Sequence, residues 1–221
     1  MADYDKINTL FKRDEKTKHI IVEEYTFSYF KMLENIKWEC TEKIDGTNIH
    51  IDIDWRSENE WDISYHGRTE RADIPKHLLA KLHGMFDSFN PHAVFTFLKP
   101  VKIEIFGEGY GVKIQKGGNY ISDGVDFILF DVRINDMWLL RNNLEDIADK
   151  IGIKIVPLVG YMTLHEAIEY VKKGFVSNIS ENREYKAEGL VLKTPEGLLD
   201  RQGKRIITKL KTVDFEKLKN K

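Results

Sequence analysis

Hydrophobic and polar residues alternate most regularly between positions 49 and 65 of the chain. Isoleucine stands at every second position from Ile49 to Ile53, and polar residues fill the positions between. This is the period of a strand with one buried face. After a polar turn at 56–60, a second alternation runs from Trp61 to Tyr65. The pattern predicts an antiparallel hairpin, with Lys43 at the entrance to its first strand.

Three segments have the apolar spacing of helices. The first extends from Asp73, the predicted N-cap, to the Asn-Pro pair at 90–91 that ends it. The second ends at Gly152. The third runs from Thr163 to Gly174 and begins with the capping-box pattern Thr-x-x-Glu.

Further strands are predicted at 101–105, 126–134, 190–192 and 205–211. The first of them leads into Gly107-Glu108-Gly109. Strand hairpins with interspersed helices indicate an α+β fold, with antiparallel sheets and flanking helices, and not a series of β-α-β units. The chain has no repeat, no low-complexity tract and no Gly/Ser linker. We therefore expect a single domain over residues 1–221.

The formal net charge of -2 argues against a protein that coats nucleic acid through bulk charge. The charges are unevenly distributed, because nine basic residues and four acidic ones lie between Lys193 and Lys221. We expect a polyphosphate or a nucleic acid to bind at this end of the chain.

Cys40 is the single cysteine, which excludes an intramolecular disulfide and favours a reducing compartment. The amino terminus lacks a basic stretch followed by an apolar run, and no window approaches ~18 consecutive apolar residues. We therefore expect a soluble, cytoplasmic protein that does not enter a membrane.

Lys43 stands directly before a tight Asp-Gly turn. A lysine with a reference pKa of about 10.4 is a poor nucleophile until it is desolvated or surrounded by cations. Three later lysines, Lys193, Lys209 and Lys211, would supply such cations and would also neutralise a triphosphate.

Two carboxylates, Glu108 and Glu188, are candidates to hold a divalent ion that bridges phosphate oxygens. An in-line displacement at phosphorus requires mainly positioning and charge neutralisation. These residue types suffice for a lysine to attack the α-phosphate of a nucleotide, with a covalent lysyl-nucleotide as the product.

Each feature taken alone also has a simpler explanation. A lone Lys-x-Asp-Gly is commonly a surface turn, and Phe130, within an apolar run, is typical of a core residue. Arg68 fits a solvated cation at the end of a hairpin. The following histidines lack a metal-ligand spacing with cysteine support, which favours surface or helix positions over a zinc site: His66, His77, His83 and His92.

Five short motifs occur in order: Glu-Lys-x-Asp-Gly-Thr-Asn at 42–48, Phe-Gly-Glu at 106–108, Phe-Asp at 130–131, Glu-Gly-x-Val-x-Lys at 188–193 and Lys-x-Lys at 209–211. From Trp38 to Thr212 the chain resembles the covalent nucleotidyltransferases, which comprise ATP-dependent polynucleotide ligases and messenger-RNA capping enzymes. The closest resemblance is to the RNA ligase 2-like family. It implies a ligase/capping-enzyme nucleotidyltransferase domain of ATP-grasp-like fold, in which antiparallel sheets form a nucleotide cleft, with ATP and Mg²⁺ or Mn²⁺ as cofactors.

The resemblance also implies roles for individual residues. Lys43 would be the nucleophile that carries AMP, and Lys209 and Lys211 would take part in catalysis through the phosphates. Asn48 would help to organise the phosphates, and Glu188 would organise the metal ion. The implied nucleotide-binding residues are Glu42, Asn48, Arg68, Glu108, Phe130, Asp131, Glu188 and Lys193.

Several of these implied contacts are specific. Glu42 would contact the adenine, and Phe130 would stack on it with Asp131 beside the ring. Arg68 would lie near the ribose and the α-phosphate, and Glu108 would bind the ribose.

We therefore expect an ATP-dependent RNA ligase that passes AMP from Lys43 to an RNA 5′-phosphate and joins that end to a 3′-hydroxyl, with RNA ends or a nicked duplex as substrate. Asp45 stands where the RNA ligase 2-like family often has histidine. A DNA ligase or a capping-type guanylyltransferase is therefore an alternative, and a degenerate nucleotide- or RNA-binding module is the non-enzymatic one.

Family members usually continue beyond the position of Lys211 into a carboxyl-terminal OB or helical domain. We expect this chain to be the catalytic module alone, without such a domain. A separate substrate-binding subunit is then a candidate partner.

Overall fold

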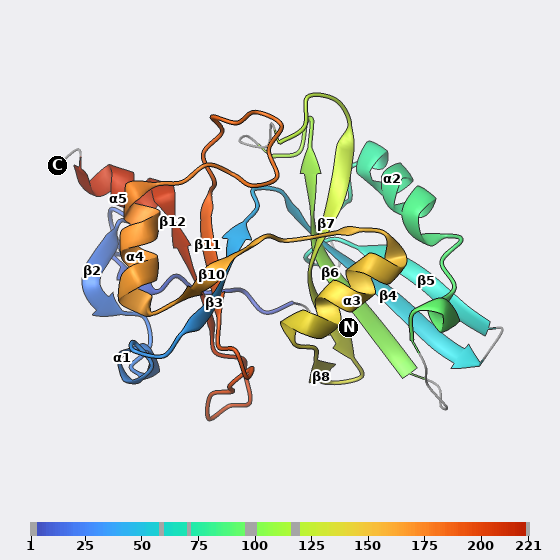
Figure 1. Cartoon of the computed structure of the whole chain (residues 1–221), viewed down its shortest axis with the longest axis horizontal. Helices are drawn as coiled ribbons and strands as arrows, with labels where there is room; N and C mark the ends of the chain where they lie inside the picture. Colours follow the sequence, from blue (N-terminus) through green and yellow to red (C-terminus); the bar gives the residue numbers. More distant parts are fainter. Residues whose placement is uncertain (1–3, 58–59, 70–71, 96–100, 116–119, 220–221) are drawn as a thin grey trace. The chain divides into compact units, whose positions relative to one another are not determined.

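The computed structural model describes residues 4–57, 60–69, 72–95, 101–115 and 120–219 (Figure 1). The chain divides into two compact units: unit 1 contains Tyr4 and Asp45–Val156, and unit 2 contains residues 5–44 and 157–219. The expectation of one nucleotidyltransferase domain over the whole chain stays a prediction.

Unit 1 is built on an antiparallel sheet in the order β5-β4-β6-β7-β8, and a short strand, β9, pairs in parallel with β7. Its elements are β4 (Thr47–Ser57), β5 (Glu60–His66), α2 (Lys76–Phe86), the 3-10 turn η1 (Pro91–Ala93), β6 (Val101–Gly111), β7 (Val125–Ile134), β8 (Met137–Trp138), α3 (Arg141–Ile151) and β9 (Lys154–Ile155). The predicted hairpin is confirmed as β4 and β5, which pair antiparallel.

The core of unit 1 lies on one face of this sheet. The isoleucines at 49, 51 and 53 are fully buried and share one cluster with side chains of α2 and α3. Leu78, Leu82 and Phe86 come from α2, whereas Leu144 and Ile147 come from α3 (Figure 1). The alternation in β4 therefore reflects a strand whose apolar side is covered by two helices.

Two glycines inside β6 explain why the strand packs so closely on its neighbours. A Cβ atom at Gly107 would lie 2.2 Å from the ring of Phe127, and one at Gly109 would lie 2.3 Å from Leu78. The Gly-Glu-Gly motif is thus part of the strand, and Glu108 between the glycines is fixed by β pairing on both sides.

Both helices predicted for unit 1 are present, but the first is shorter at both ends than predicted, because it begins after Pro75 and ends at Phe86, before the Asn-Pro pair at 90–91. Helix α3 ends at Gly152, which takes a φ of 77°. Helix α2, however, has Pro75 and not Asp73 at its N-cap, and its last residue is Phe86. The prediction that Asp73 caps this helix is wrong, because the extended backbone at Pro75 places the first turn after the proline.

Unit 2 contains a four-stranded antiparallel sheet in the order β10-β3-β11-β12 and a separate two-stranded sheet, β1-β2. Its elements are β1 (Phe11–Arg13), β2 (Ile20–Tyr25), α1 (Tyr29–Met32), β3 (Trp38–Lys43), β10 (Leu158–Met162), α4 (Leu164–Lys173), β11 (Gly189–Lys193), β12 (Ile207–Lys211) and α5 (Thr212–Lys219). Lys43 therefore ends β3 in unit 2. The prediction that it stands at the entrance to the hairpin strand is wrong.

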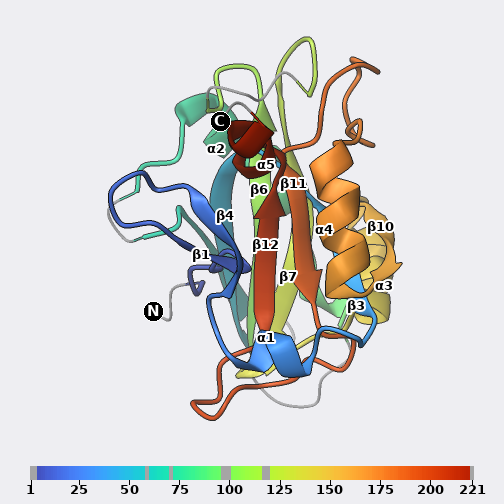
Figure 2. The same ribbon diagram turned by 90° about the vertical axis from the view of Figure 1, so that its left-hand side faces the viewer.

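One face of the four-stranded sheet is apolar and is covered by helices. Trp38 and Cys40 of β3 join Leu190 of β11 and Leu210 of β12 in a buried cluster with side chains of α4 and α5. Figure 2 shows α4 running alongside these strands. The capping box of α4 at Thr163 is confirmed, and the helix ends at Gly174 as predicted.

The strands β1, β2, β3 and β10 and the helices α1 and α5 were not anticipated from the sequence. The overall prediction of an α+β fold with antiparallel sheets is nevertheless confirmed. Among the described residues, no helix has both the length and the apolar character required to cross a membrane.

Candidate active site

The polar face of the unit 2 sheet brings two of the predicted lysines into one row. Gly189 on β11 is the direct partner of Lys43 on β3 and of Lys211 on β12. Residues that face each other across antiparallel strands project to the same side of a sheet. The two ammonium groups therefore lie on either side of the glycine, which has no side chain to separate them.

Glu188, the residue before this glycine, links the two lysines. Its Oε2 atom accepts from Lys43 Nζ at 2.5 Å, and its Oε1 atom lies 2.6 Å from Lys211 Nζ. The exposed fractions of the three side chains are 20% for Lys43, 16% for Glu188 and 30% for Lys211. Solvent screens such a pair less than it screens a surface pair.

Gly189 is required where it stands, because a Cβ atom there would lie 1.9 Å from the carbonyl oxygen of Leu210. Its φ of 153° is also one that residues with side chains rarely adopt. The Glu188 carbonyl in turn accepts from the Thr212 amide at 2.9 Å. The Glu-Gly motif thus allows β12 to approach closely and fixes the position of Glu188.

The other two predicted lysines lie further along the same face. Lys209 occupies the next row, where Val191 is its direct partner, and Lys193 lies beside Glu39, four residues along β11 from the glycine. At a rise of ~3.3 Å per residue, Lys193 is roughly 13 Å along the strand from the row of Lys43. Direct contact with Glu188 is therefore shown for Lys211, and the phosphate roles of Lys193 and Lys209 stay predictions.

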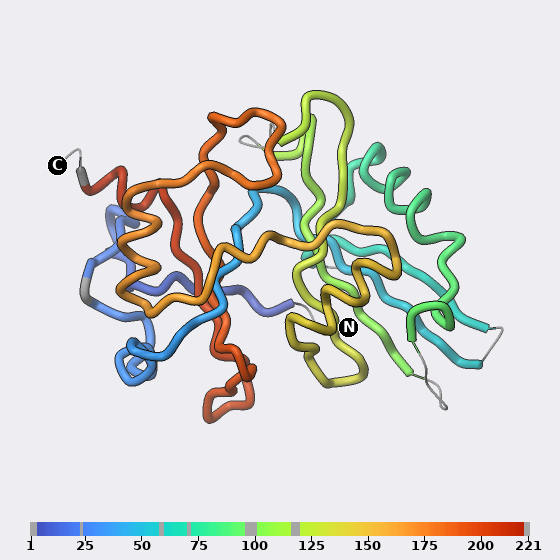
Figure 3. The backbone as a smooth tube through the Cα atoms, viewed as in Figure 1, coloured from blue at the N-terminus to red at the C-terminus, as the bar shows by residue number. Residues whose placement is uncertain are grey.

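Glu42 points to the opposite side of β3 from Lys43. The residue is 1% exposed, and its carboxylate accepts hydrogen bonds from Ser177 Oγ at 2.5 Å and from the Asn178 backbone amide at 2.8 Å. The Asn178 side chain donates to the same carboxylate at 3.2 Å. Glu42 therefore anchors the segment 175–188 that connects α4 to β11, drawn in orange in Figure 3. Its predicted contact with adenine is not tested by this arrangement.

In unit 1, two predicted residues are direct partners across β4 and β6: Asn48 and Glu108. The Asn48 Oδ1 atom is buried and has no hydrogen-bond partner among the described residues. Buried carbonyl oxygens are nearly always hydrogen-bonded, so this atom is suited to accept a bond from a ligand. The turn before Asn48 is tight, since a Cβ atom at Gly46 would lie 2.3 Å from the Gly109 carbonyl oxygen.

Phe130 is displaced from the regular pattern of β7. The register of β6 and β7 shifts at Phe106, whose partner is Asp131, and Phe130 is left as the extra residue of a bulge. It is half-buried and does not belong to the core beneath α2 and α3. A bulge can re-aim a side chain away from a sheet's core, so this geometry favours a ligand contact over the simpler core explanation.

Tyr4 supports both residues of the Phe-Asp motif and was not identified from the sequence. Its hydroxyl donates to Asp131 at 2.6 Å, and its ring meets Phe130 edge-on at 5.2 Å between centroids. Asp131 is fully buried. The remaining predicted residue of unit 1, Arg68, is exposed just after β5.

The predicted site residues thus fall into two sets, each within one unit. Unit 2 contains Glu42, Lys43, Glu188, Lys193, Lys209 and Lys211, and unit 1 contains Asn48, Arg68, Glu108, Phe130 and Asp131. Within unit 2 a lysine amine thus lies beside a carboxylate, and carboxylate oxygen is a preferred ligand of Mg²⁺ and Mn²⁺.

Comparison with protein families gives a match to the RNA ligase family over residues 36–211. No curated protein matches the chain at a significant level. The chain is similar to solved structures of a Naegleria gruberi RNA ligase.

An arginine-to-alanine mutant of that ligase with ATP and Mn gives a TM-score of 0.63 at 19% identity, and the match covers 100% of this chain and 59% of that one. A lysine-to-alanine mutant with ATP and Mn gives 0.59 at 19% identity, covering 98% and 62%. The structure with PPi gives 0.59 at 21% identity, covering 99% and 64%. The chain therefore spans about three fifths of the length of these solved structures, and the similarity shows a shared fold.

Proposed function

The chain belongs to the RNA ligase family, and from this premise we propose that it is an ATP-dependent RNA ligase in which Lys43 forms a covalent lysyl-AMP intermediate. The observation that carries the proposal is the row in which Glu188 contacts both Lys43 and Lys211. It gives the amine a neighbouring cation and an acid able to hold a metal ion, which are the two requirements for attack on a polyphosphate.

In the first step, the Lys43 amine attacks the α-phosphorus of ATP. A nitrogen–phosphorus bond forms, the bond from the α-phosphorus to the bridging oxygen breaks, and pyrophosphate leaves with that oxygen. The amine gives up its proton to solvent or to a neighbouring base. Because charge on the departing pyrophosphate must be neutralised, Lys211 and the divalent ion are the proposed stabilising groups.

Glu188 has two successive tasks in this proposal. Without a metal ion its carboxylate pairs with Lys43, and the amine must leave this contact before it can attack phosphorus. Mg²⁺ or Mn²⁺ at Glu188 would compete for the same oxygen atoms and release the amine. The Naegleria structures that contain ATP and Mn support ATP and a divalent metal as cofactors.

AMP then passes to the 5′-phosphate of an RNA, and a 3′-hydroxyl attacks this activated phosphate and expels AMP. The roles proposed for the remaining residues follow the family pattern: Glu42 and Phe130 for adenine, Glu108 for ribose, Asn48, Arg68, Lys193 and Lys209 for the phosphates, and Asp131 beside Phe130. The unpartnered Oδ1 atom of Asn48 and the bulge at Phe130 support two of these assignments.

Labelled ATP tests the proposal directly. The purified protein is incubated with Mg²⁺ or Mn²⁺ and with ATP labelled at the α-phosphate, and protein-bound label is measured after denaturation. We expect label on the wild type and on Lys37→Ala, a control at an exposed lysine of the same unit, and none on Lys43→Ala. Label retained on Lys43→Ala would refute the mechanism.

The same assay separates the alternatives. Labelling with GTP in preference to ATP would identify a capping-type guanylyltransferase, and the absence of any adduct would favour a binding module without transfer. Sealing of nicked duplexes with RNA or DNA at the 3′-hydroxyl side distinguishes an RNA ligase from a DNA ligase.

The proposed substrates are RNA ends or a nicked duplex. The proposed location is the cytoplasm, because the chain has a single cysteine. A separate substrate-binding subunit stays a prediction.

A further inference from the structure

The polar face of the unit 1 sheet contains a buried cluster of one imidazole and two carboxylates. His50 and Asp52 are two residues apart on β4 and so lie on the same face, and Glu104 on β6 is the direct partner of Asp52. The exposed fractions are 4% for His50, 8% for Asp52 and 1% for Glu104. The isoleucines between these residues face the helices, so the cluster is on the other side of the sheet from the core.

Two atoms in this cluster are left without hydrogen bonds. His50 Nε2 lies 2.9 Å from Asp52 Oδ1 and 3.4 Å from Glu104 Oε1. Neither His50 Nε2 nor Asp52 Oδ1 has a hydrogen bond of acceptable geometry among the described residues. Buried polar atoms are rarely left in this state, and three converging nitrogen and oxygen atoms form a ready-made set of ligands.

We propose that His50, Asp52 and Glu104 form a binding site for a divalent transition-metal ion such as Zn²⁺. The site is distinct from the metal position proposed at Glu188. A metal with bonds of ~2.1 Å separates its ligand atoms by roughly 3.0 Å in an octahedral shell and by roughly 3.4 Å in a tetrahedral one. The distances of 2.9 Å and 3.4 Å from His50 Nε2 to the two carboxylates lie in the range of such separations, so a small rearrangement of the side chains would place all three atoms around one ion.

A second histidine lies beside the cluster on its exposed side, where its Nε2 atom is also 2.9 Å from Ser64 Oγ. His66 on β5 is the direct partner of His50, and its Nε2 atom lies 3.7 Å from Asp52 Oδ2. Its side chain is 25% exposed. A mixture of imidazole and carboxylate ligands suits Zn²⁺ and Co²⁺ better than Mg²⁺, which prefers oxygen ligands.

In the absence of metal, a lysine side chain occupies part of the proposed metal site. Lys102 Nζ lies 3.3 Å from Asp52 Oδ1 and 3.0 Å from Glu104 Oε1, so it bridges the two carboxylates as a cation would. Its side chain is 41% exposed and can swing into solvent. The Lys102 contact shows that the two carboxylates favour a positive charge between them.

Arg133 fixes one of the ligands from behind. Its Nε donates to Glu104 Oε2 at 2.5 Å, and a second guanidinium nitrogen donates to Oε1 at 2.7 Å. Such outer contacts orient metal ligands. Metal binding therefore requires the Lys102 side chain to move away, whereas Arg133 stays in place. The bound ion would link strands β4, β5 and β6 across the sheet.

Cobalt binding tests this site without nucleotide. The full chain, freed of any affinity tag and treated with a chelator, is titrated with Co²⁺, and bound metal is measured by equilibrium dialysis and by visible absorption. We expect one equivalent in the wild type, at least tenfold weaker binding in His50→Gln and Asp52→Asn, and unchanged binding in Asp54→Asn. Asp54 is a matched control because it is exposed on the same strand.

Two further variants keep the test decisive. Lys102→Met should bind Co²⁺ several-fold more tightly, a gain that misfolding cannot produce. Glu188→Gln should bind Co²⁺ like the wild type, which separates this site from the proposed catalytic metal. If neither the wild type nor Lys102→Met binds Co²⁺, the cluster is only an internal ion-pair network and the proposal is wrong. Equal binding of Co²⁺ by His50→Gln and by the wild type would also overturn the proposal. Because no nucleotide is present, either result leaves the proposed ligase activity untouched.

Discussion

Glu188 accepts a hydrogen bond from Lys43 at 2.5 Å, so the proposed nucleophile and the proposed metal ligand are in direct contact. The contact joins residues 145 positions apart in the chain. In the proposed mechanism the Lys43 amine must leave this contact before it can attack phosphorus. In the proposed mechanism Glu188 would also hold the divalent ion, so its contact with Lys43 and its contact with the metal would compete for the same oxygen atoms.

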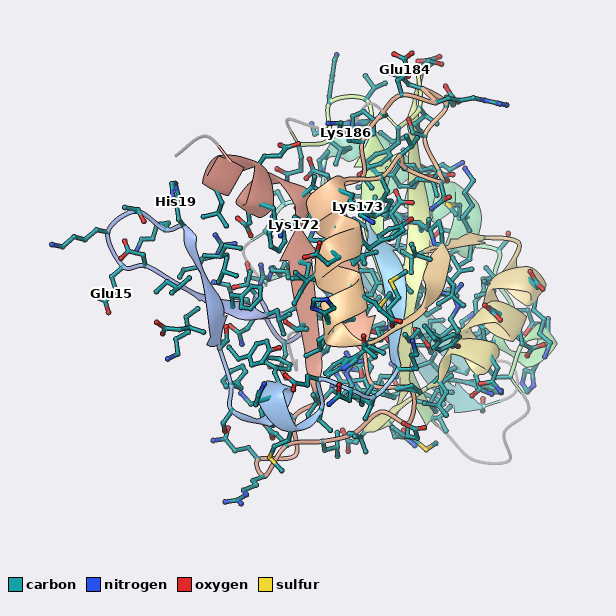
Figure 4. All side chains as sticks on the ribbon, turned by 60° about the vertical axis from the view of Figure 1, so that its left-hand side comes forward. Glu15, His19, Lys172, Lys173, Glu184 and Lys186 are labelled. Carbon is teal, nitrogen blue, oxygen red and sulfur yellow. The ribbon has the colours of Figure 1, made fainter. Side chains whose placement is uncertain are left out.

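Replacing Glu188 by glutamine should therefore slow adenylation. The amide keeps the shape of the side chain but loses the charge that holds the cation, and loss of one preorganised electrostatic group costs roughly 10²–10³-fold in rate. The measurement is single-turnover labelling with ATP across a range of Mn²⁺ concentrations. Glu184→Gln is the control, since this exposed acid lies on the same connecting segment (Figure 4). Equal rates for Glu188→Gln and Glu184→Gln would contradict the assignment.

Lys211→Ala should also slow adenylation while leaving the fold intact. It removes the second cation that contacts Glu188, and we expect a loss of roughly 10²-fold, the size typical of one electrostatic contact in a transition state. Lys186→Ala serves as the control, because Lys186 is exposed and its Nζ atom is 3.8 Å from the carboxylate of Glu216 (Figure 4). Circular dichroism checks folding. An unchanged labelling rate would show that Lys211 acts elsewhere.

Gly189→Ala should destabilise the protein and impair adenylation together. The new Cβ atom would meet the Leu210 carbonyl oxygen at 1.9 Å, and the backbone would be held at an unfavourable φ. Strain of this kind costs about 1–3 kcal/mol. Urea unfolding measures the loss. Gly84→Ala is the contrasting variant, because nothing lies within 4 Å of its Cβ position in α2 and alanine favours a helix by up to about 1 kcal/mol. If both variants were equally stable, the structure would be wrong in placing β12 so close to Gly189.

The sequence predicted the elements whose signals are local. The capping box at Thr163 and the left-handed glycine at Gly152 each depend on a few neighbouring residues, and both stand as expected. Strand β3 was missed because its apolar residues, Trp38 and Cys40, are followed on the same side by Glu42. That carboxylate can be buried because Ser177 and Asn178, which are far away in the sequence, donate hydrogen bonds to it.

Residue types at the site were predictable, whereas their contacts were not. The motifs drew attention to Lys43, Glu188 and Lys211, but the shared carboxylate depends on the register of three strands from distant parts of the chain. Alternation likewise gave β4 correctly but made His50 look solvent-facing. It is buried, with its ring stacked on Phe106 and with Glu104 3.4 Å from its Nε2 atom, and a period of two residues carries no information about such neighbours on the adjacent strand.

Asp126, at the start of β7, gives a prediction about pH. Its Oδ2 atom lies 3.0 Å from Lys154 Nζ and accepts from the Tyr110 hydroxyl at 3.3 Å, and Lys81 lies 3.6 Å from Oδ1. Burial raises the pKa of this carboxyl, but the hydrogen bond and charge of Lys154, together with the Phe127 amide and the charge of Lys81, outweigh burial and lower the pKa below its ordinary value.

A carboxyl whose pKa is lower in the folded state stabilises the fold above its unfolded pKa, and this contribution is lost as the pH falls through the folded value. We therefore expect Asp126→Asn to lower the free energy of unfolding by roughly 1 kcal/mol at pH 7, because one partner, Lys154, is largely exposed. The difference from the wild type should shrink as the pH falls below about 4 and should vanish once Asp126 is protonated in the folded state as well. Urea unfolding at a series of pH values measures it, with Asp146→Asn, at an exposed acid of α3, as the control. A difference that stayed constant down to the lowest pH would show that the loss comes from packing and not from the charge of Asp126.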